Sequence, residues 1–438
     1  MTKNNNRRYF YWLVLAAIIG VLPFVFRSSA AVSLMSSMGI AIIFALSYNL
    51  LLGQTGMLSF GHAVYSGLGA YVAIHALNLI GRGRIWFPVT LLPLIGALGG
   101  MFFGILFGYV TTRRAGTTFA MISLGIAEMV AASALMLPDF FGGEAGISTN
   151  RAVGGSFLGI TYGPQIQVYF LIAFWAVVCA VLMYGLTQTP FGRIANAVRD
   201  NPERVEFIGY DPQRVRFIML VLSAAFAGVA GALSAINYEI VTAENVGPVR
   251  SGTVLLATFT GGVGQFFGPI IGAIVITFLE VALSSFTKAW ILYFGLIFLA
   301  MVLYVPGGIA SLIVVHKPLW QAGLTRRMLP SYLLALVCAL VLLAGIVGLV
   351  EINYFISDSQ PGETMSLLGF SFDPRTLPPW LATLVPLGVG ALAVRFAARR
   401  VRSAWQAATQ ELAQRTRRIQ ENNDDAPGGA KLTAEQVL

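Results

Sequence analysis

Long apolar runs dominate this 438-residue sequence and restrict what it can fold into. A helix that crosses a bilayer needs about 20 consecutive apolar residues. Charged residues make up only 11% of the chain, against about 25% in a soluble domain. These features exclude a soluble globular enzyme and a disordered chain, and they predict an all-α polytopic membrane protein. The predicted spans are 9–26, 32–52, 62–80, 86–111, 117–137, 166–188, 217–238, 268–286, 289–304, 330–350 and 379–397.

A further apolar run, 247–262, is shorter and is broken by glycines. It predicts a half-helix or a re-entrant segment. With this run included, we expect about ten core transmembrane crossings and two more at the C-terminus. The first span follows Arg7 and Arg8 and lacks a small-residue cleavage site, so we interpret it as a transmembrane helix and not as a signal peptide. The expected divisions are an N-terminal end with the first helix (1–30), a core (31–320), an extension with two transmembrane helices (321–397) and a basic, partly disordered tail (398–438).

The positive charges predict an orientation. Loops on the cytoplasmic side of a membrane protein are enriched in Lys and Arg. If the N-terminus is cytoplasmic and each run crosses once, 21 of the 28 Lys and Arg residues lie on the cytoplasmic side. This bias predicts that both termini are cytoplasmic.

The cytoplasmic loop 189–216 carries helix-start signals. Asn201 precedes Pro202, which is an N-cap residue followed by a proline suited to the first helical position. Gly209 can end that short helix, and Asp211 with Pro212 repeats the start signal. We therefore expect an ordered loop with short helices that lie along the membrane.

The sequence shows no pattern typical of an enzyme. A phosphate-binding loop needs G-x-x-x-x-G-K-[ST], and none of the four lysines has that context. The three histidines and two cysteines lie on separate segments, so we predict no catalytic set, no metal site and no cofactor. Energy for active transport would come from a partner protein.

Two polar residues inside the predicted spans are candidates for function. Glu128 lies in the middle of 117–137, where a carboxylate is costly, and indicates either a polar pathway or a structural hydrogen-bond network. His62 follows a glycine-spaced stretch. It could relay protons, but we favour a structural, hydrogen-bonded residue at the start of a helix.

Five stretches, taken in order, resemble the LivM-type permease subunits of branched-chain amino acid ABC importers. The resemblance covers about residues 31–320, which would be the permease core. The stretches are ALSYNLLLGQTGMLSFGHAVYSGLGAYVA (45–73), RRAGTTFAMISLGIAEMV (113–130), FGGEAGI (141–147), TPFGRIANAVRDNPERVEFIGYDPQRVRFIMLVLSAAFAGVAGALSA (189–235) and GGVGQFFGPIIGA (261–273).

The resemblance implies a multi-pass protein of the bacterial inner membrane that is not itself an enzyme. It would pair with a homologous permease subunit, two cytoplasmic ATP-binding subunits and an extracytoplasmic substrate-binding protein. From its own residues, the tail is expected to form a basic helix that contacts anionic membrane lipid, and no nucleic acid is expected. ATPase coupling would fall on the loop residues Gly192, Arg193, Arg199, Asp200, Glu203, Arg204, Glu206 and Gly209. Substrate would pass near Asn49, Gln54, Ser59, His62 and Glu128.

The sequence departs from the family pattern in two places. The chain continues beyond 320 with two spans that the family core does not require, and the outer loop reads GGEAGI in place of the expected threonine before the glycine pair and Asp or Asn within the loop. Substrate class therefore stays open between branched-chain amino acids and the urea, short amides or aromatic acids that similar permeases import. A secondary carrier or channel that acts alone, and a membrane-embedded enzyme without a visible catalytic cluster, are the alternatives from other classes.

Overall fold

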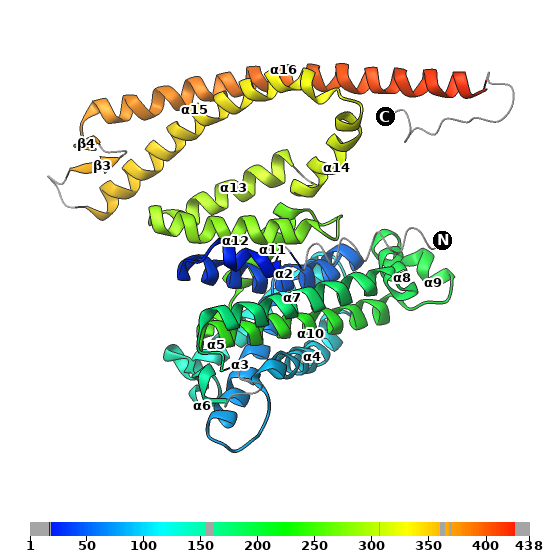
Figure 1. Cartoon of the computed structure of the whole chain (residues 1–438), viewed down its shortest axis with the longest axis vertical. Helices are drawn as coiled ribbons and strands as arrows, with labels where there is room; N and C mark the ends of the chain where they lie inside the picture. Colours follow the sequence, from blue (N-terminus) through cyan, green and yellow to red (C-terminus); the bar gives the residue numbers. More distant parts are fainter. Residues whose placement is uncertain are drawn as a thin grey trace. The chain divides into compact units, whose positions relative to one another are not determined.

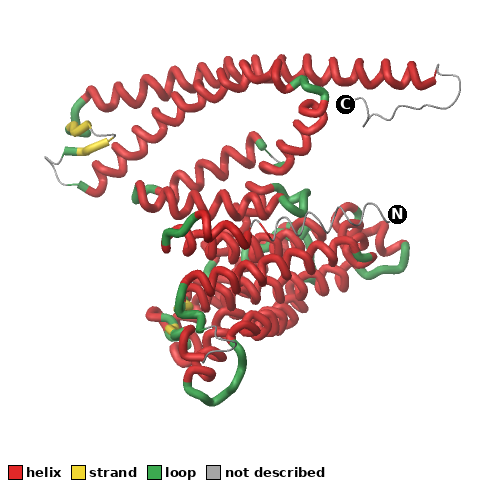
Figure 2. The backbone as a smooth tube through the Cα atoms, viewed as in Figure 1, coloured by secondary structure: helices red, strands yellow, loops and turns green. Residues whose placement is uncertain are grey.

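The computed structural model is almost entirely helical (Figures 1 and 2). It describes residues 17, 19–154, 161–305, 307–359, 364–367 and 370–424. Strands are confined in this described part to two short antiparallel pairs, β1 (Ile147–Ser148) with β2 (Ile240–Val241) and β3 (Met365–Leu367) with β4 (Phe370–Phe372). The predicted all-α class is confirmed.

The helices follow the apolar runs closely. Their bounds are α2 Ser29–Thr55, α3 His62–Gly81, α4 Leu92–Thr111, α5 Thr117–Met136, α6 Pro138–Phe141, α7 Gln165–Gln188, α8 Pro190–Asp200, α9 Pro202–Phe207, α10 Pro212–Tyr238, α11 Pro248–Gly261, α12 Gly268–Phe286, α13 Trp290–Tyr304, α14 Gly308–Gln321, α15 Thr325–Asp358 and α16 Leu377–Asp424. Short 3-10 turns cover Val89–Leu91, Gly143–Ala145, Arg151–Gly154 and Ala243–Val246.

Nine helices in the described residues are long and apolar enough to cross a membrane, and the bent pair α13 and α14 could add a tenth. This number agrees with the predicted polytopic architecture. The run 247–262 forms α11, which has 14 residues. At about 1.5 Å per residue, α11 reaches roughly 21 Å and is shorter than the about 30 Å hydrocarbon core. The predicted first span, 9–26, lies largely outside the described residues.

One compact unit comprises residues up to Phe286 together with Phe294–Ser311. Its central helix, α10, packs against α2, α3 and α4. Small residues allow this close approach: a Cβ on Gly228 would collide with the backbone of Gly96, and a Cβ on Gly231 would collide with the carbonyl oxygen of Ser66. Lipid tails are as apolar as the helices, so the hydrophobic effect does not drive membrane helices together. Their association relies on close van der Waals packing, which small residues permit.

A glycine turn connects α11 to α12. Gly262 has φ 116°, which favours glycine. A Cβ on Gly272 would collide with the carbonyl oxygen of Ala257, and one on Gly261 with the carbonyl oxygen of Gly268. The half-length of α11 thus follows from a tight hairpin that only small residues permit.

The second unit comprises Thr287–Tyr293 and Leu312–Leu438, and its main feature is the hairpin of α15 and α16. Lys288 donates a hydrogen bond to Asp358, at 2.9 Å, and this bond raises the pKa of the Lys288 side chain. The described tail continues α16 as a helix to Asp424. Residues 425–438, which the sequence analysis treats as the polar end of a partly disordered tail, lie outside the described residues. The predicted division at 320 stays a prediction.

Candidate functional site

The loop between α7 and α10 is ordered by three side-chain caps. The hydroxyl of Thr189 accepts from the amide of Gly192 at 3.2 Å and begins α8. Asn201 accepts from the amide of Arg204 at 3.0 Å and begins α9. Asp211 accepts from the amide of Gln213 at 2.8 Å and begins α10. These caps satisfy amides that a helix start leaves unpaired, so the predicted short helices are present.

Arg199 connects this loop to the end of α2. Its guanidinium donates to the carbonyl oxygen of Gly53 at 2.5 Å and to the carboxylate of Asp200 at 3.0 Å. Gly56, which ends α2 with φ 70°, lies against the aliphatic part of the Arg199 side chain. Movement of α8 would therefore act directly on the cytoplasmic end predicted for α2.

Beside these polar contacts the loop exposes an apolar patch, which consists of Phe207, Ile208 and Tyr210. Their exposed fractions are 90%, 63% and 49%. Gly209 has φ 89° and makes the turn between α9 and α10. Six other predicted coupling residues are exposed, namely Arg193, Arg199, Asp200, Glu203, Arg204 and Glu206, whereas Gly192 is buried. Sequence reasoning selected the charged positions and missed the aromatic ones, although the string EFIGY places three large apolar side chains in a loop otherwise rich in charge.

His62 lies in the interior of the helix bundle, between the rings of Phe44, Tyr48 and Tyr65. The hydroxyl of Ser47 donates to the Phe44 carbonyl at 2.7 Å, so it has no second proton to give. It therefore accepts from Nε2 of His62 at 3.0 Å. The hydrogen bond and the surrounding rings thus hold the buried His62 side chain in one orientation.

Side chains from other helices accept hydrogen bonds from backbone amides of the connection 56–61 and of the first turn of α3. Ser123 accepts from the amide of Phe60 at 3.0 Å, and Ser251 accepts from the amide of Ala63 at 3.0 Å. Ser59 is 1% exposed, and its carbonyl accepts from the hydroxyl of Tyr48 at 3.0 Å. Ser59 and His62, both predicted pathway residues, thus belong to one buried cluster.

Of the other predicted pathway residues, two are turned inward and one lies on the surface. Asn49 is 3% exposed and Gln54 is partly buried, and each has a buried side-chain oxygen without a hydrogen-bond partner among the described residues. Glu128 is exposed on α5. It shares one helical face with Met121 and Gly125, which are also exposed. The structure therefore separates one surface carboxylate from four positions turned inward.

A polar junction that the sequence analysis did not single out lies at the end of α10, on the side predicted to be extracytoplasmic. The guanidinium of Arg151 donates to the carbonyls of Asn237 and Gly163, at 3.1 and 3.2 Å, and to the side chain of Gln165 at 3.1 Å. A cation at the C-terminal end of α10 also suits the helix dipole. Together with the β1–β2 pair, Arg151 fastens the long 137–164 loop to the end of α10. Within the described residues no group of three or more His, Cys, Asp and Glu side chains could hold a metal.

Comparison with known proteins gives consistent results. A family model described as "Branched-chain amino acid transport system / permease component" matches residues 30–306. The chain is 29% identical over 321 residues to the high-affinity branched-chain amino acid transport system permease protein LivM of Salmonella typhimurium, a match that covers 68% of this chain and 74% of the relative. The LivM protein of Escherichia coli is 29% identical over 291 residues, covering 62% and 67%. A probable branched-chain amino acid transport permease protein LivH of Methanocaldococcus jannaschii is 25% identical over 285 residues, covering 62% and 88%. No solved structure gives a significant match.

Proposed function

The chain belongs to the family of branched-chain amino acid transport permease components, and from this premise we propose that it is the permease subunit of an ABC importer for branched-chain or closely related amino acids. The observation that carries the proposal is the family match over 30–306, which contains the complete α8–α9 segment. An ATP-driven importer whose membrane chain has no nucleotide-binding loop needs separate ATPase subunits. We propose that these subunits dock on the α8–α9 segment.

The α8–α9 segment supports a cytoplasmic ATPase contact in two ways. Phe207 and Ile208 are exposed apolar side chains in an ordered loop, and large aromatic anchors of this kind dominate protein interfaces. Arg199 links the same loop to the end of α2 by a hydrogen bond, so that a displacement of the docked partner can reach the membrane helices. The charged residues around the patch would set the orientation of the partner.

For the substrate pathway we propose the exposed face of α5. A carboxylate that faced lipid at mid-span would cost about 2.5–3.5 kcal/mol, so Glu128 fits a polar surface formed with a second, homologous permease subunit. The similarity to relatives named LivM and LivH supports two permease types in such a system. Ser59, His62, Asn49 and Gln54 would support the pathway from behind, because their side chains lie mainly inside this chain.

The direct test is uptake of labelled leucine in cells with and without the gene, in a strain that lacks other leucine carriers. We expect uptake to fall on deletion, to recover with the wild-type gene, and to be reduced by unlabelled valine but not by urea or benzoate. Unchanged leucine uptake, with the importer shown to be expressed, would overturn the amino-acid assignment. Competition by urea or benzoate alone would move the substrate to amides or aromatic acids.

A further inference from the structure

The hairpin of α15 and α16 contains an open groove of about 490 Å³. It lies between two closely packed regions of the hairpin. On one side, a Cβ on Gly345 would come within 2.7 Å of Leu387, and one on Gly390 within 2.6 Å of Leu342. On the other side, Met328 and Ala408 belong to a buried apolar cluster. Between these regions alanine and valine side chains of both helices line the groove.

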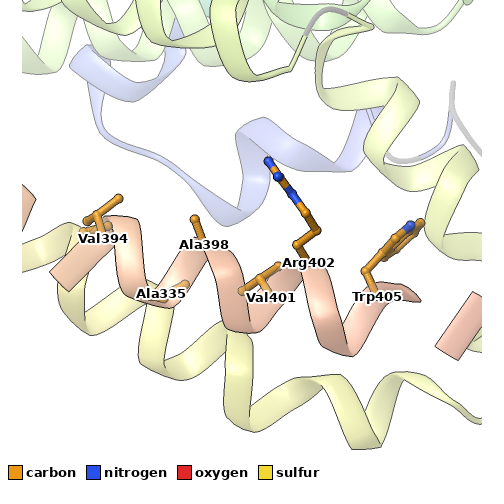
Figure 3. Close-up of a pocket in the computed structure, with 8 residues that line it drawn as sticks. Ala335, Val394, Ala398, Val401, Arg402 and Trp405 are labelled. Carbon is orange, nitrogen blue, oxygen red and sulfur yellow. The ribbon is translucent and has the colours of Figure 1, made fainter. Parts of the chain in front are cut away.

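The lining of the groove changes in character along its length. Alanine and valine side chains form most of it, and Arg402 and Trp405 complete it at one end (Figure 3). Figure 3 shows Val394, Ala398, Arg402 and Trp405 along one side of α16. The apolar part belongs to segments that can span a membrane. Arg402 is the last charged residue of the basic stretch that follows the apolar part of α16.

The charge around the groove is positive and largely uncompensated. Arg395, Arg399, Arg400 and Arg402 lie within eight residues of one helix. The first acid on α16 is Glu411, and it pairs with Arg327 and Arg415. In the described part of the chain none of the four arginines forms an ion pair.

We propose that this groove binds one anionic phospholipid, with an acyl chain along the alanine and valine wall and the phosphate beside Arg402. A basic site between membrane helices near the headgroup level is suited to an anionic lipid headgroup. Tryptophan is favoured at that level because its ring is apolar and its N–H is polar. The apolar end of the groove lies at the level of the lipid acyl chains. The positive end favours a lipid with an anionic headgroup. The proposal does not depend on the transported substrate.

The experiment is native mass spectrometry of the purified full-length chain with dioleoyl phosphatidylglycerol or dioleoyl phosphatidylcholine. We expect the wild-type chain to retain one phosphatidylglycerol molecule at least about fivefold more than phosphatidylcholine, the factor that one basic residue near a membrane surface provides. Arg402→Gln should remove this preference. Arg399→Gln, on the same helix but outside the groove, should keep most of this preference because Arg399 does not line the site.

A third variant tests the apolar wall. Ala398→Leu fills the groove, and we expect it to lower retention of both lipids, with the elution profile and helical content of wild type as the check on folding. Equal retention of the two lipids by wild type would overturn the proposal. The same holds if Arg399→Gln and Arg402→Gln reduce phosphatidylglycerol retention equally, because the effect would then be the general charge of the helix. Should Ala398→Leu fail to fold, the two arginine variants still decide the outcome, since both side chains are exposed.

Discussion

At the scale of single residues, burial separates the polar side chains of the membrane region into two roles. His62 and Ser59 are 1% exposed and have hydrogen-bond partners within the chain. Glu128 is exposed on a helix whose neighbouring surface residues are apolar. The first arrangement orients the connection between α2 and α3, and the second leaves a carboxylate on the surface of the described residues.

We expect Glu128→Gln to lower leucine uptake severalfold with unchanged amounts of protein in the membrane, because the amide keeps the size of the side chain and loses its charge. Met121→Leu, on the same face of α5 and 66% exposed, is the matched control and should leave uptake near wild type. Uptake assays in the deletion strain give both values. Wild-type uptake by Glu128→Leu, which removes all polarity, would exclude Glu128 from the pathway.

The sequence predicted the positions of these residues but not their surroundings. A glutamate within an apolar run is visible in the sequence, whereas the helix face on which it lies depends on packing against other helices. The ring of aromatic side chains around His62 comes from α2 and α3 together. Phe207 was missed because the sequence does not show whether an apolar residue in a loop is buried or exposed. The structure shows that this side chain is 90% exposed.

At the scale of elements, α8 and α9 form a capped pair of short helices with two separable features. Arg199 faces the end of α2, and Phe207 is exposed to solvent. Docking and transmission should therefore respond to different substitutions.

We expect Phe207→Ser to abolish co-purification of the ATPase subunits, because it removes the exposed aromatic anchor. Arg199→Gln should retain the ATPase subunits and lower uptake severalfold, because the shorter neutral side chain loses the bond to the Gly53 carbonyl. Trp86→Ser is the control for Phe207→Ser, because Trp86 is a similarly exposed aromatic residue in a different loop. Arg114→Gln, in the loop 112–116, is the control for Arg199→Gln. Loss of the ATPase subunits in Arg199→Gln would show that the two features are not separable.

Hydropathy predicted most membrane helices to within a few residues, because a bilayer demands length and apolarity before any tertiary contact forms. Cap residues also located the starts of α9 and α10, since Asn and Asp before proline act locally. The bend between α13 and α14 was not predicted. It falls beside Gly308, whose φ of 70° and contact with the backbone of Gly262 depend on a distant segment.

At the scale of the whole chain, contacts between loops agree with alternating crossings. β1 and β2 join the segments that follow α5 and α10, and Arg199 joins the segments that follow α7 and α2. Lys288 and Asp358, and likewise Arg327 and Glu411, join segments that the alternation also assigns to a common side. Within each unit these contacts bring together loops that the prediction assigns to one side, and the Lys and Arg bias predicts the direction.

This orientation predicts the result of thiol labelling in spheroplasts. We expect a membrane-impermeant maleimide to label Trp86→Cys directly and Phe207→Cys only after permeabilisation. The two positions are 84% and 90% exposed, so access and not local burial decides the result. Cys338→Ser is the background, since Cys179 is buried. The reverse labelling pattern would invert the proposed topology.

The bond between Arg199 and Gly53 has a consequence for the variation expected among natural sequences. Its acceptor is a backbone carbonyl, which every amino acid provides, so no mutation at position 53 deletes the acceptor itself. The glycine at 53 is constrained separately, because a Cβ there would crowd the side chain of Asn49. Selection on the contact therefore acts on the arginine alone. Two positions in physical contact would then change independently during evolution, and covariation would not reveal that they touch.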